Sequence, residues 1–387
     1  MPNTFITTDL VAREALLLLR NNLVATRLFD RRYESNFTGQ EKIGDTVSIR
    51  RRDEGTVQEF TGTISTPDNQ ETSITLTLEK HFDASFSVTT KDLTLEIQSF
   101  SEQLLAPRMI RLAERVDQYC LSKLHHLPNV GGANTFGGVT GDVPTSLPNS
   151  AASMAQVRRT LNELRVPMTN RVQICSPEYE AVLLGVDTFV EADKRGDGGS
   201  ALEEASIGRV MGFDYFMGQN VDDSLFTSGT FTTGDVSANV AAGASSIPID
   251  GTVGATDTVK AGDLLNIAGY GNVVVANDAT AAANAVTITI VEPLKKDVAD
   301  NAVVTKFGGS AETFNRHGAA FHPRAFALAM VPLAVPPEAE GSVIGFDGLA
   351  VRAVRDYNIS TKSSVMSLDV LVGARMVDGE LGCQIIV

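Results

Sequence analysis

Histidine and cysteine are the residue types most able to do chemistry, and the spacing of the histidines favours no reactive site. The chain holds five histidines. His125 and His126 end a predicted helix, where positive charge is mildly favoured. His81 belongs to a predicted strand. His317 and His322 are close together but have no third metal ligand nearby. We therefore predict no catalytic, cofactor-binding or metal-binding residue.

Sequence motifs of common enzyme classes are absent as well. There is no GxxxxGK[ST], G-x-S-x-G, HExxH or EF-hand series. The glycine-rich run at 131–141 lacks a lysine and follows a helix rather than a strand, so it predicts a loop. We expect a protein that is not an enzyme. The enzyme alternative stays open, because pairs of acidic side chains can act without a motif.

The number and spacing of the cysteines and the hydropathy of the chain indicate the kind of cellular compartment in which the protein folds. Cys120, Cys175 and Cys383 are odd in number and far apart, which predicts buried free thiols in a reducing compartment. The start, MPNTFITTDL, lacks the basic and apolar regions of a signal peptide. No apolar run reaches the roughly 18 residues of a membrane span. We expect no membrane association.

The charge is strongly acidic, with one basic exception. A net charge of −15 argues against a nucleic-acid-binding surface, although it does not exclude a protein that encloses nucleic acid. Arg50, Arg51 and Arg52 form a basic triplet on a predicted strand. Such a triplet usually lies on a solvent-exposed face. In an acidic protein it is also a candidate for pairing with a neighbouring subunit.

Two unusually long elements position these residues. From Ile74 to Val88, apolar residues alternate with polar ones, which predicts a strand of roughly 50 Å with one apolar face. Thr90–His126 follows, and from Leu105 onward its apolar residues recur at steps of three and four. This spacing predicts a helix that is also about 50 Å long, with a kink or break at Pro107. The apolar strand face requires a partner surface, because a protruding hairpin cannot cover it alone.

The rest of the chain predicts an α/β or α+β fold with an inserted β domain. Residues 5–28 predict an amphipathic helix, and 40–90 a long hairpin. Ser150–Arg165 predicts a helix, Arg171–Cys175 a short buried strand, and Pro177 the start of another helix. From about Asp222 to Ala311, strand-like bursts with turn signals predict a small barrel or sandwich. His317–Leu333 predicts a helix. Strands close the chain at Leu349–Val387.

This order of elements, with several local phrases, resembles the major capsid (coat) proteins of tailed bacteriophages, which have the Hong Kong ninety-seven type fold. The phrases are MPNTFITTDLVAREALLLLRNNL at the start, IGRVMGFDYFMGQNV at Ile207–Val221, FHPRAFALAMVPL at Phe321–Leu333, and the segment Gly348–Ile386. The resemblance covers nearly the whole chain. The inserted β domain resembles that of podovirus-type coat proteins.

The resemblance implies a division of the chain into named parts. These are an N-terminal arm (1–39), an extended β-hairpin loop (40–90), a peripheral domain with a spine helix (91–145), an axial domain in two parts (146–221 and 312–345), an inserted all-β domain (222–311), and C-terminal strands that return to the core (346–387). Hexamers and pentamers of such subunits would form an icosahedral shell around double-stranded DNA.

The resemblance also implies partners and contacts. The chain would bind itself, a separate scaffolding protein and a portal protein. It would assemble in the bacterial host cytoplasm and enclose DNA without sequence-specific binding. The acidic charge predicts an inner surface that does not adhere to that DNA. The candidate contacts between subunits are Leu18, Arg50, Arg51, Arg52, Phe60, Ile74, Leu76, Leu78 and Phe82. Crosslinking between subunits is not expected, because the hairpin holds few lysines.

Two other classes of protein stay open. The first is an encapsulin-like shell protein of a bacterial compartment, which has the same fold and encloses an enzyme cargo. The second is an unrelated enzyme or carbohydrate-binding module in which the β domain does the work. The inserted β domain argues against the first, and a genome neighbourhood with portal and terminase genes would decide between it and a capsid protein. Glycan binding by a monomer would favour the second.

Overall fold

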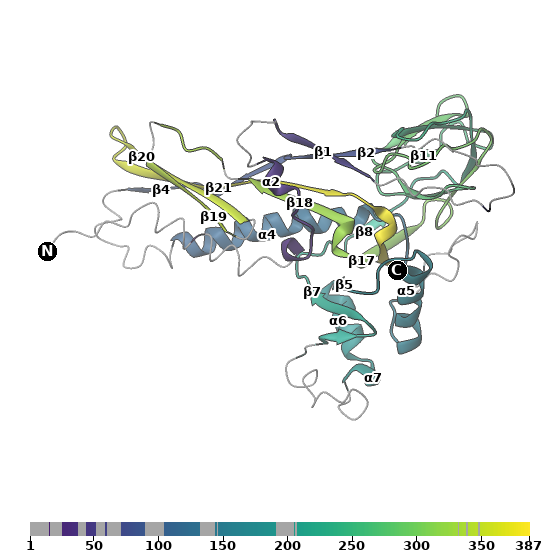
Figure 1. Ribbon diagram of the computed structural model, residues 1–387, viewed down its shortest axis with the longest axis horizontal. Helices are drawn as coiled ribbons and strands as arrows, with labels where there is room; N and C mark the ends of the chain where they lie inside the picture. Colours follow the sequence, from purple (N-terminus) through teal and green to yellow (C-terminus); the bar gives the residue numbers. More distant parts are fainter. Residues whose placement is uncertain are drawn as a thin grey trace. The chain divides into compact units, whose positions relative to one another are not determined.

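The computed structural model describes residues 15, 25–37, 44–51, 59, 71–89, 104–131, 144, 146–190, 205, 207–331, 333–337, 340–346 and 349–387. The chain forms two units (Figure 1). Unit 1 comprises Met1–Val47, Leu76–Leu121 and Phe326–Arg375, and unit 2 comprises Ser48–Thr75, Ser122–Ala325 and Met376–Val387. The predicted N-terminal helix lies almost wholly outside the described residues. No helix in the described ranges is long and apolar enough to cross a membrane.

Unit 1 is a sheet with one long helix on it. The strand order is β18-β21-β20-β19, and β3 and β4 also pair with β21. The elements are η1 (Ala25–Arg27), α2 (Glu34–Phe37), β3 (Lys80–Asp83), β4 (Phe86–Thr89), α4 (Ala106–Ser122), β18 (Phe326–Val331), β19 (Glu340–Phe346), β20 (Leu349–Asn358) and β21 (Ser363–Met376). The closing strands are therefore confirmed as β20 and β21.

The helix α4 buries the predicted stripe. Leu112, Val116 and Tyr119 are all buried, and the Tyr119 ring lies 6.2 Å from that of Phe82 on β3. Ala374 of β21 donates its backbone N–H to the Tyr119 hydroxyl at 3.2 Å. Pro107 lies in the first turn of α4, where its missing N–H costs no hydrogen bond, and Leu104 and Leu105 directly before α4 are in π-helical conformation. Residues 90–103, the first part of the predicted helix, lie outside the described ranges.

The predicted strand from Ile74 to Val88 is divided into three. β1 (Thr46–Arg50) pairs with β2 (Ser73–Thr77), and hydrogen bonds at both ends show an antiparallel ribbon: Arg51 N to Thr72 O and Leu78 N to Asp45 O, each 2.9 Å. β3 and β4 pair with β21 instead. Their register is continuous, from Val372–Lys80 to Ser363–Thr89. The prediction of one uninterrupted strand is wrong, because the chain exchanges one partner strand for another.

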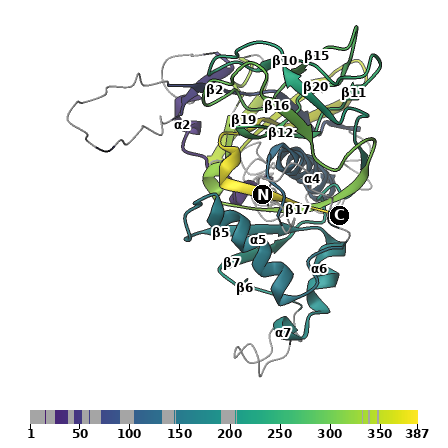
Figure 2. The ribbon, with the colours of Figure 1, turned by 90° about the vertical axis from the view of Figure 1, so that its right-hand side faces the viewer.

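The host part of unit 2 is a second sheet covered by helices. Its order is β22-β17-β5-β7-β6, with β8 pairing to β17. The elements are η3 (Lys123–His126), α5 (Ala151–Glu163), β5 (Arg171–Cys175), α6 (Pro177–Leu184), α7 (Asp187–Val190), β6 (Arg209–Val210), β7 (Phe213–Met217), β8 (Leu225–Thr227), β17 (Thr313–Phe321), η4 (Pro323–Ala325), η5 (Gly379–Leu381) and β22 (Gly382–Ile386). In Figure 2, α5 and α6 lie beside β5 and β7. The predicted α5, β5 and α6 are confirmed.

The predicted helix at His317–Leu333 is wrong. The segment holds the end of β17, the short η4 turn and β18. Both faces of these strands are buried, and Phe326, Leu328 and Met330 are all at most 1% exposed. A strand covered on both faces shows no alternation, so its apolar run cannot be distinguished from a buried helix by spacing.

The inserted segment of unit 2 forms a closed six-stranded barrel. Its order is β13-β12-β16-β9-β10-β15, and the bridge between Val275 and Ile290 joins the first strand to the last. The strands are β9 (Thr233–Val236), β10 (Ser246–Asp250), β12 (Leu264–Ile267), β13 (Gly271–Val274), β15 (Val286–Thr289) and β16 (Val303–Lys306), with a small pair β11 (Thr258–Val259) and β14 (Ala279–Thr280). Closure leaves no open sheet edge. The predicted inserted β domain is confirmed.

Candidate subunit contacts and the Arg51 network

One arrangement in unit 2 resembles a catalytic triad and has to be tested as one. The Ser176 hydroxyl lies 3.2 Å from Nδ1 of His317, and a Glu178 carboxylate oxygen lies 3.8 Å from the same nitrogen. A triad instead uses the two ring nitrogens for two different partners. Ser176 is also fully buried and caps α6 by accepting the N–H of Tyr179. The arrangement therefore holds the start of a helix in place.

The cysteines and His317 are also buried. All three cysteines are free and buried. Burial raises the pKa of the Cys383 thiol to about 12, so it is not a thiolate near neutral pH. Burial lowers the pKa of His317, which favours the neutral ring. The described part of the chain contains no group of three or more His, Cys, Asp or Glu side chains that could hold a metal ion.

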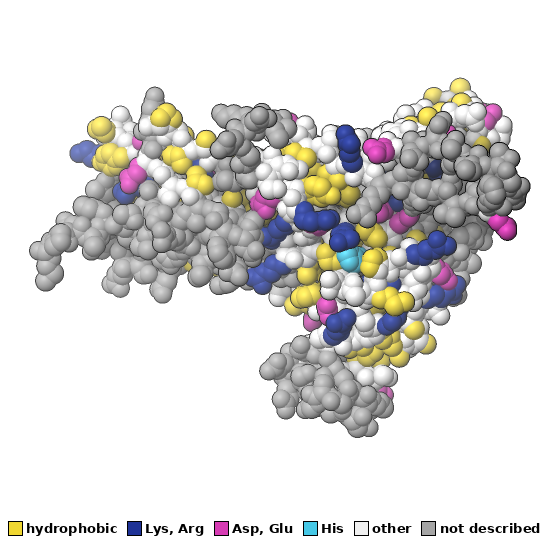
Figure 3. Space-filling model, viewed as in Figure 1, with side chains coloured by type: hydrophobic (Ala, Val, Ile, Leu, Met, Phe, Trp, Pro, Cys, Tyr) yellow, Lys and Arg dark blue, Asp and Glu magenta, His cyan; other side chains and the backbone are white. Residues whose placement is uncertain are grey.

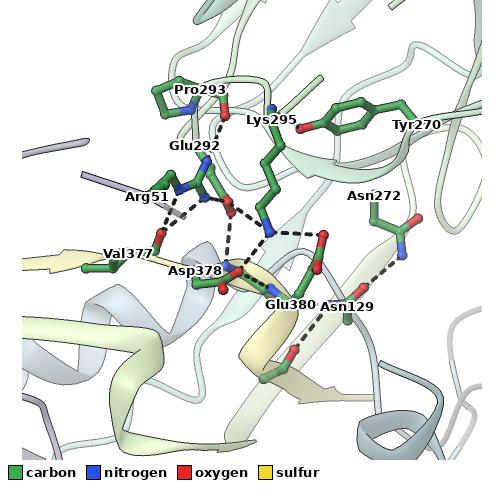
Figure 4. A network of polar contacts seen from close by, with 12 residues as sticks. Arg51, Asn129, Tyr270, Asn272, Glu292, Pro293, Lys295, Val377, Asp378 and Glu380 are labelled. Atoms are coloured by element: carbon green, nitrogen blue, oxygen red, sulfur yellow. Dashed lines mark hydrogen bonds and ion pairs between the residues drawn. The ribbon is translucent and has the colours of Figure 1, made fainter. Parts of the chain in front are cut away.

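The main polar site of unit 2 is a buried network around Arg51 (Figure 4). Arg51 directly follows β1, and its side chain is only 8% exposed. It forms an ion pair with Glu292, and it donates to Val377 O at 3.1 Å and to Pro293 O at 3.2 Å. Burial lowers the pKa of the Arg51 guanidinium, while Asp378 opposes this shift. The guanidinium stays charged, because its ordinary pKa exceeds 12.

The network continues through Lys295 to the C-terminal turn. Lys295 Nζ lies 2.8 Å from Asp378 Oδ1 and 2.9 Å from Glu380 Oε1. Glu292 accepts the N–H of Gly379 at 3.0 Å. Three segments that are far apart in sequence are thus held together: the end of β1, the barrel segment 292–295, and residues 377–380. We call this set the Arg51 network.

A second set of amides supports the same turn. Asn129 is buried and donates to the backbone oxygens of Gly379 and Gly382 at 3.1 and 3.2 Å. Asn272, on the barrel strand β13, donates to Asn129 Oδ1 at 3.2 Å. The barrel is therefore connected to the C-terminal turn by both charged and neutral hydrogen bonds.

The predicted contact residues have different outcomes. Arg50 is exposed and forms a 3.9 Å ion pair with Glu71 at the surface of the described part of the chain, so its contact role stays a prediction. The prediction for Arg51 is wrong, because its partners lie in its own chain. A signal for this was present: Arg51 continues the alternation of the buried residues Val47 and Ile49. Nothing in the spacing of Glu292, Lys295 or Asp378 indicated that they meet.

The two apolar residues of β2 also need correction. Ile74 is 1% exposed and Leu76 is fully buried within the chain itself. The argument that their face needs a neighbouring subunit is therefore wrong. Leu78 and Phe82 are partly buried, and their contact role stays a prediction. Leu18, Arg52 and Phe60 lie outside the described residues.

Comparisons with known proteins support the fold through structure alone. No protein-family model matches the chain, and no curated protein matches it in sequence. A solved structure from Mycobacterium phage Che8 is similar over 94% of this chain and 90% of that one, with 14% identity and a TM-score of 0.53. The capsid of Ralstonia phage GP4 is similar over 93% and 86%, with 9% identity and a TM-score of 0.50.

A virus-like particle from Pyrococcus furiosus also matches, over 97% of both chains at 9% identity, but its TM-score of 0.40 supports no argument. The fold is that of phage capsid proteins, an α+β fold with an inserted all-β domain.

Proposed function

We propose that this chain is the major capsid protein of a tailed bacteriophage. Subunits assemble as hexamers and pentamers into an icosahedral shell that encloses double-stranded DNA, with the help of scaffolding and portal proteins. The observation that carries the proposal is the likeness to the Ralstonia phage GP4 capsid over 93% of the chain. The burial of Ser176, the three cysteines and His317 supports a structural role over an enzymatic one.

Surface features of unit 1 support assembly. The hairpin between β20 and β21 exposes two large apolar side chains, Tyr357 at 48% and Ile359 at 79%. Exposed apolar groups at a hairpin tip are suited to a contact with another subunit. We include three of the predicted contact residues in this proposal and expect them to contact a neighbouring subunit: Arg50, Leu78 and Phe82. Leu18, Arg52 and Phe60 join it on the sequence resemblance.

The second candidate is an encapsulin-like compartment shell with the same fold. It would enclose protein cargo in place of DNA. The contents of purified particles distinguish the two functions: nuclease-protected DNA supports the capsid, and a co-purifying enzyme supports the compartment.

Light scattering and negative-stain electron microscopy of the purified chain, alone and with a scaffolding partner, test the proposal. We expect capsomer-sized oligomers or closed shells. A monomer under every condition would overturn both shell functions and direct attention to the barrel and its ligands.

A further inference from the structure

The solvent-facing side of α4 carries a row of three arginines. Arg111 and Arg115 are exposed, and Arg108 lies at the margin of the same face. The Arg111 side chain is 82% exposed. In Figure 3, several Lys and Arg side chains gather near the middle of the face that is drawn. We call Arg108, Arg111 and Arg115 the α4 basic stripe.

The stripe is only partly neutralised. α4 contains two acidic residues. Glu114 pairs with Arg111 at 2.7 Å, whereas Asp117 is buried and accepts the N–H of Ala25. Arg115 donates to the neutral Gln118 at 3.2 Å, and Arg108 donates to Leu104 O and lies over the Phe86 ring. The exposed face thus carries excess positive charge in a chain whose net charge is −15.

We propose that the α4 basic stripe contacts the phosphate backbone of the double-stranded DNA inside the shell. The inference rests on the proposed function. Arginine binds phosphate in a bidentate manner, which lysine does not. The stripe extends along about 10 Å of helix axis, a length over which duplex DNA presents about six phosphate charges. The contact is independent of base sequence, and the acidic remainder of the chain keeps it weak. At this stripe it replaces the expectation, drawn from the net charge, of an inner surface that does not adhere to DNA.

The test measures binding of a short fluorescein-labelled duplex by fluorescence anisotropy, using the full chain between about 50 and 200 mM NaCl. The variant is Arg111→Gln/Arg115→Gln, which leaves Arg108 on its aromatic ring. The matched control is Arg159→Gln/Arg209→Gln, which removes two other exposed arginines and the same charge. Glutamine has nearly the helix propensity of arginine, so α4 should be preserved.

For the wild type we expect log K to fall with log[NaCl] with a slope of about 3, and for the stripe variant with a slope of about 1. The control should retain the wild-type slope. Equal losses in variant and control, or no wild-type binding at the lowest salt, would overturn the proposal. So would equally tight, stripe-dependent binding of poly-glutamate, which would assign the stripe to an acidic protein. Negative-stain microscopy of the same samples reports shell assembly separately, so failure of the proposed function is distinguishable.

Discussion

At the residue scale, the ion pair of Arg51 and Glu292 joins the end of β1 to the barrel segment. Both side chains are largely buried, at 8% and 14% exposure. Removing one partner of such a pair leaves a buried charge that water cannot reach. Replacing both by apolar groups of similar size avoids that penalty.

We predict that Arg51→Ala lowers the free energy of unfolding by about 2–4 kcal/mol. The neighbouring Arg50→Ala should change it by less than about 0.5 kcal/mol, because its ion pair is exposed. The double variant Arg51→Met/Glu292→Leu should recover part of the loss. Urea unfolding followed by circular dichroism measures all three. If Arg50→Ala and Arg51→Ala lowered the free energy of unfolding equally, the buried Arg51 network would contribute no more to stability than an exposed ion pair.

His125 gives a prediction about pH. Burial and the nearby Arg316 lower its pKa to about 4, although Asp222 opposes them. The unfolded-state pKa is about 6.5, so between these values the unfolded chain binds the proton more readily. As far as His125 is concerned, the free energy of unfolding is therefore greatest above about pH 6.5 and falls as the pH drops toward 4. His125→Gln should remove about 1–2 kcal/mol of the stability lost between about pH 7 and pH 5. An unchanged pH dependence would contradict this.

At the element scale, Gly318 shows how the central sheet of unit 2 limits its sequence. Its φ is +133°, and an added Cβ would lie 2.0 Å from the carbonyl oxygen of Ile174 on β5. Gly269, in the turn between β12 and β13, also has a positive φ of +78°, but nothing lies within 4 Å of the added atom.

These two glycines form a matched pair of variants. We predict that Gly318→Ala lowers stability by more than about 3 kcal/mol or yields insoluble protein, because backbone must move. Gly269→Ala should cost only about 1–2 kcal/mol, the left-handed backbone penalty. Thermal unfolding of both proteins is the measurement. Similar costs at the two positions would mean that close approach at β5 is not the limiting factor.

Elements with one covered face could be predicted from the period of their apolar residues. The stripe Leu112, Val116 and Tyr119 of α4 has open solvent on its other side, so its period is visible in the sequence. β18 is covered on both sides, so its residues do not alternate between apolar and polar. Its sequence therefore predicts a helix. Arg51 falls between these cases, since the alternation of β1 indicates its burial but its partner Glu292 lies in a distant segment that only the folded chain brings close.

At the scale of the whole molecule, the barrel has its own core and its own point of attachment. The buried cluster that includes Phe231, Ile247 and Val304 is drawn entirely from the barrel segment. The chain enters and leaves at adjacent positions, where Ser228 N donates to Glu312 O at 2.8 Å. Both features favour independent folding.

We predict that residues 228–311, expressed alone, fold cooperatively and give a single thermal transition by circular dichroism. Deleting the same residues from the chain should destabilise the remainder, because Asp378 and Glu380 lose Lys295 as a partner. A barrel segment that remains unfolded alone would contradict the first expectation. Unchanged expression, folding and particle size after deletion would contradict the second.

The central claim is that copies of this chain build a closed shell, and cryo-electron microscopy of purified particles tests it most directly. We predict an icosahedral reconstruction in which this chain occupies both sixfold and fivefold positions, with density for α4, the β1–β2 ribbon and the barrel in each copy. A preparation that yields only monomers, with and without scaffolding protein, would contradict the account.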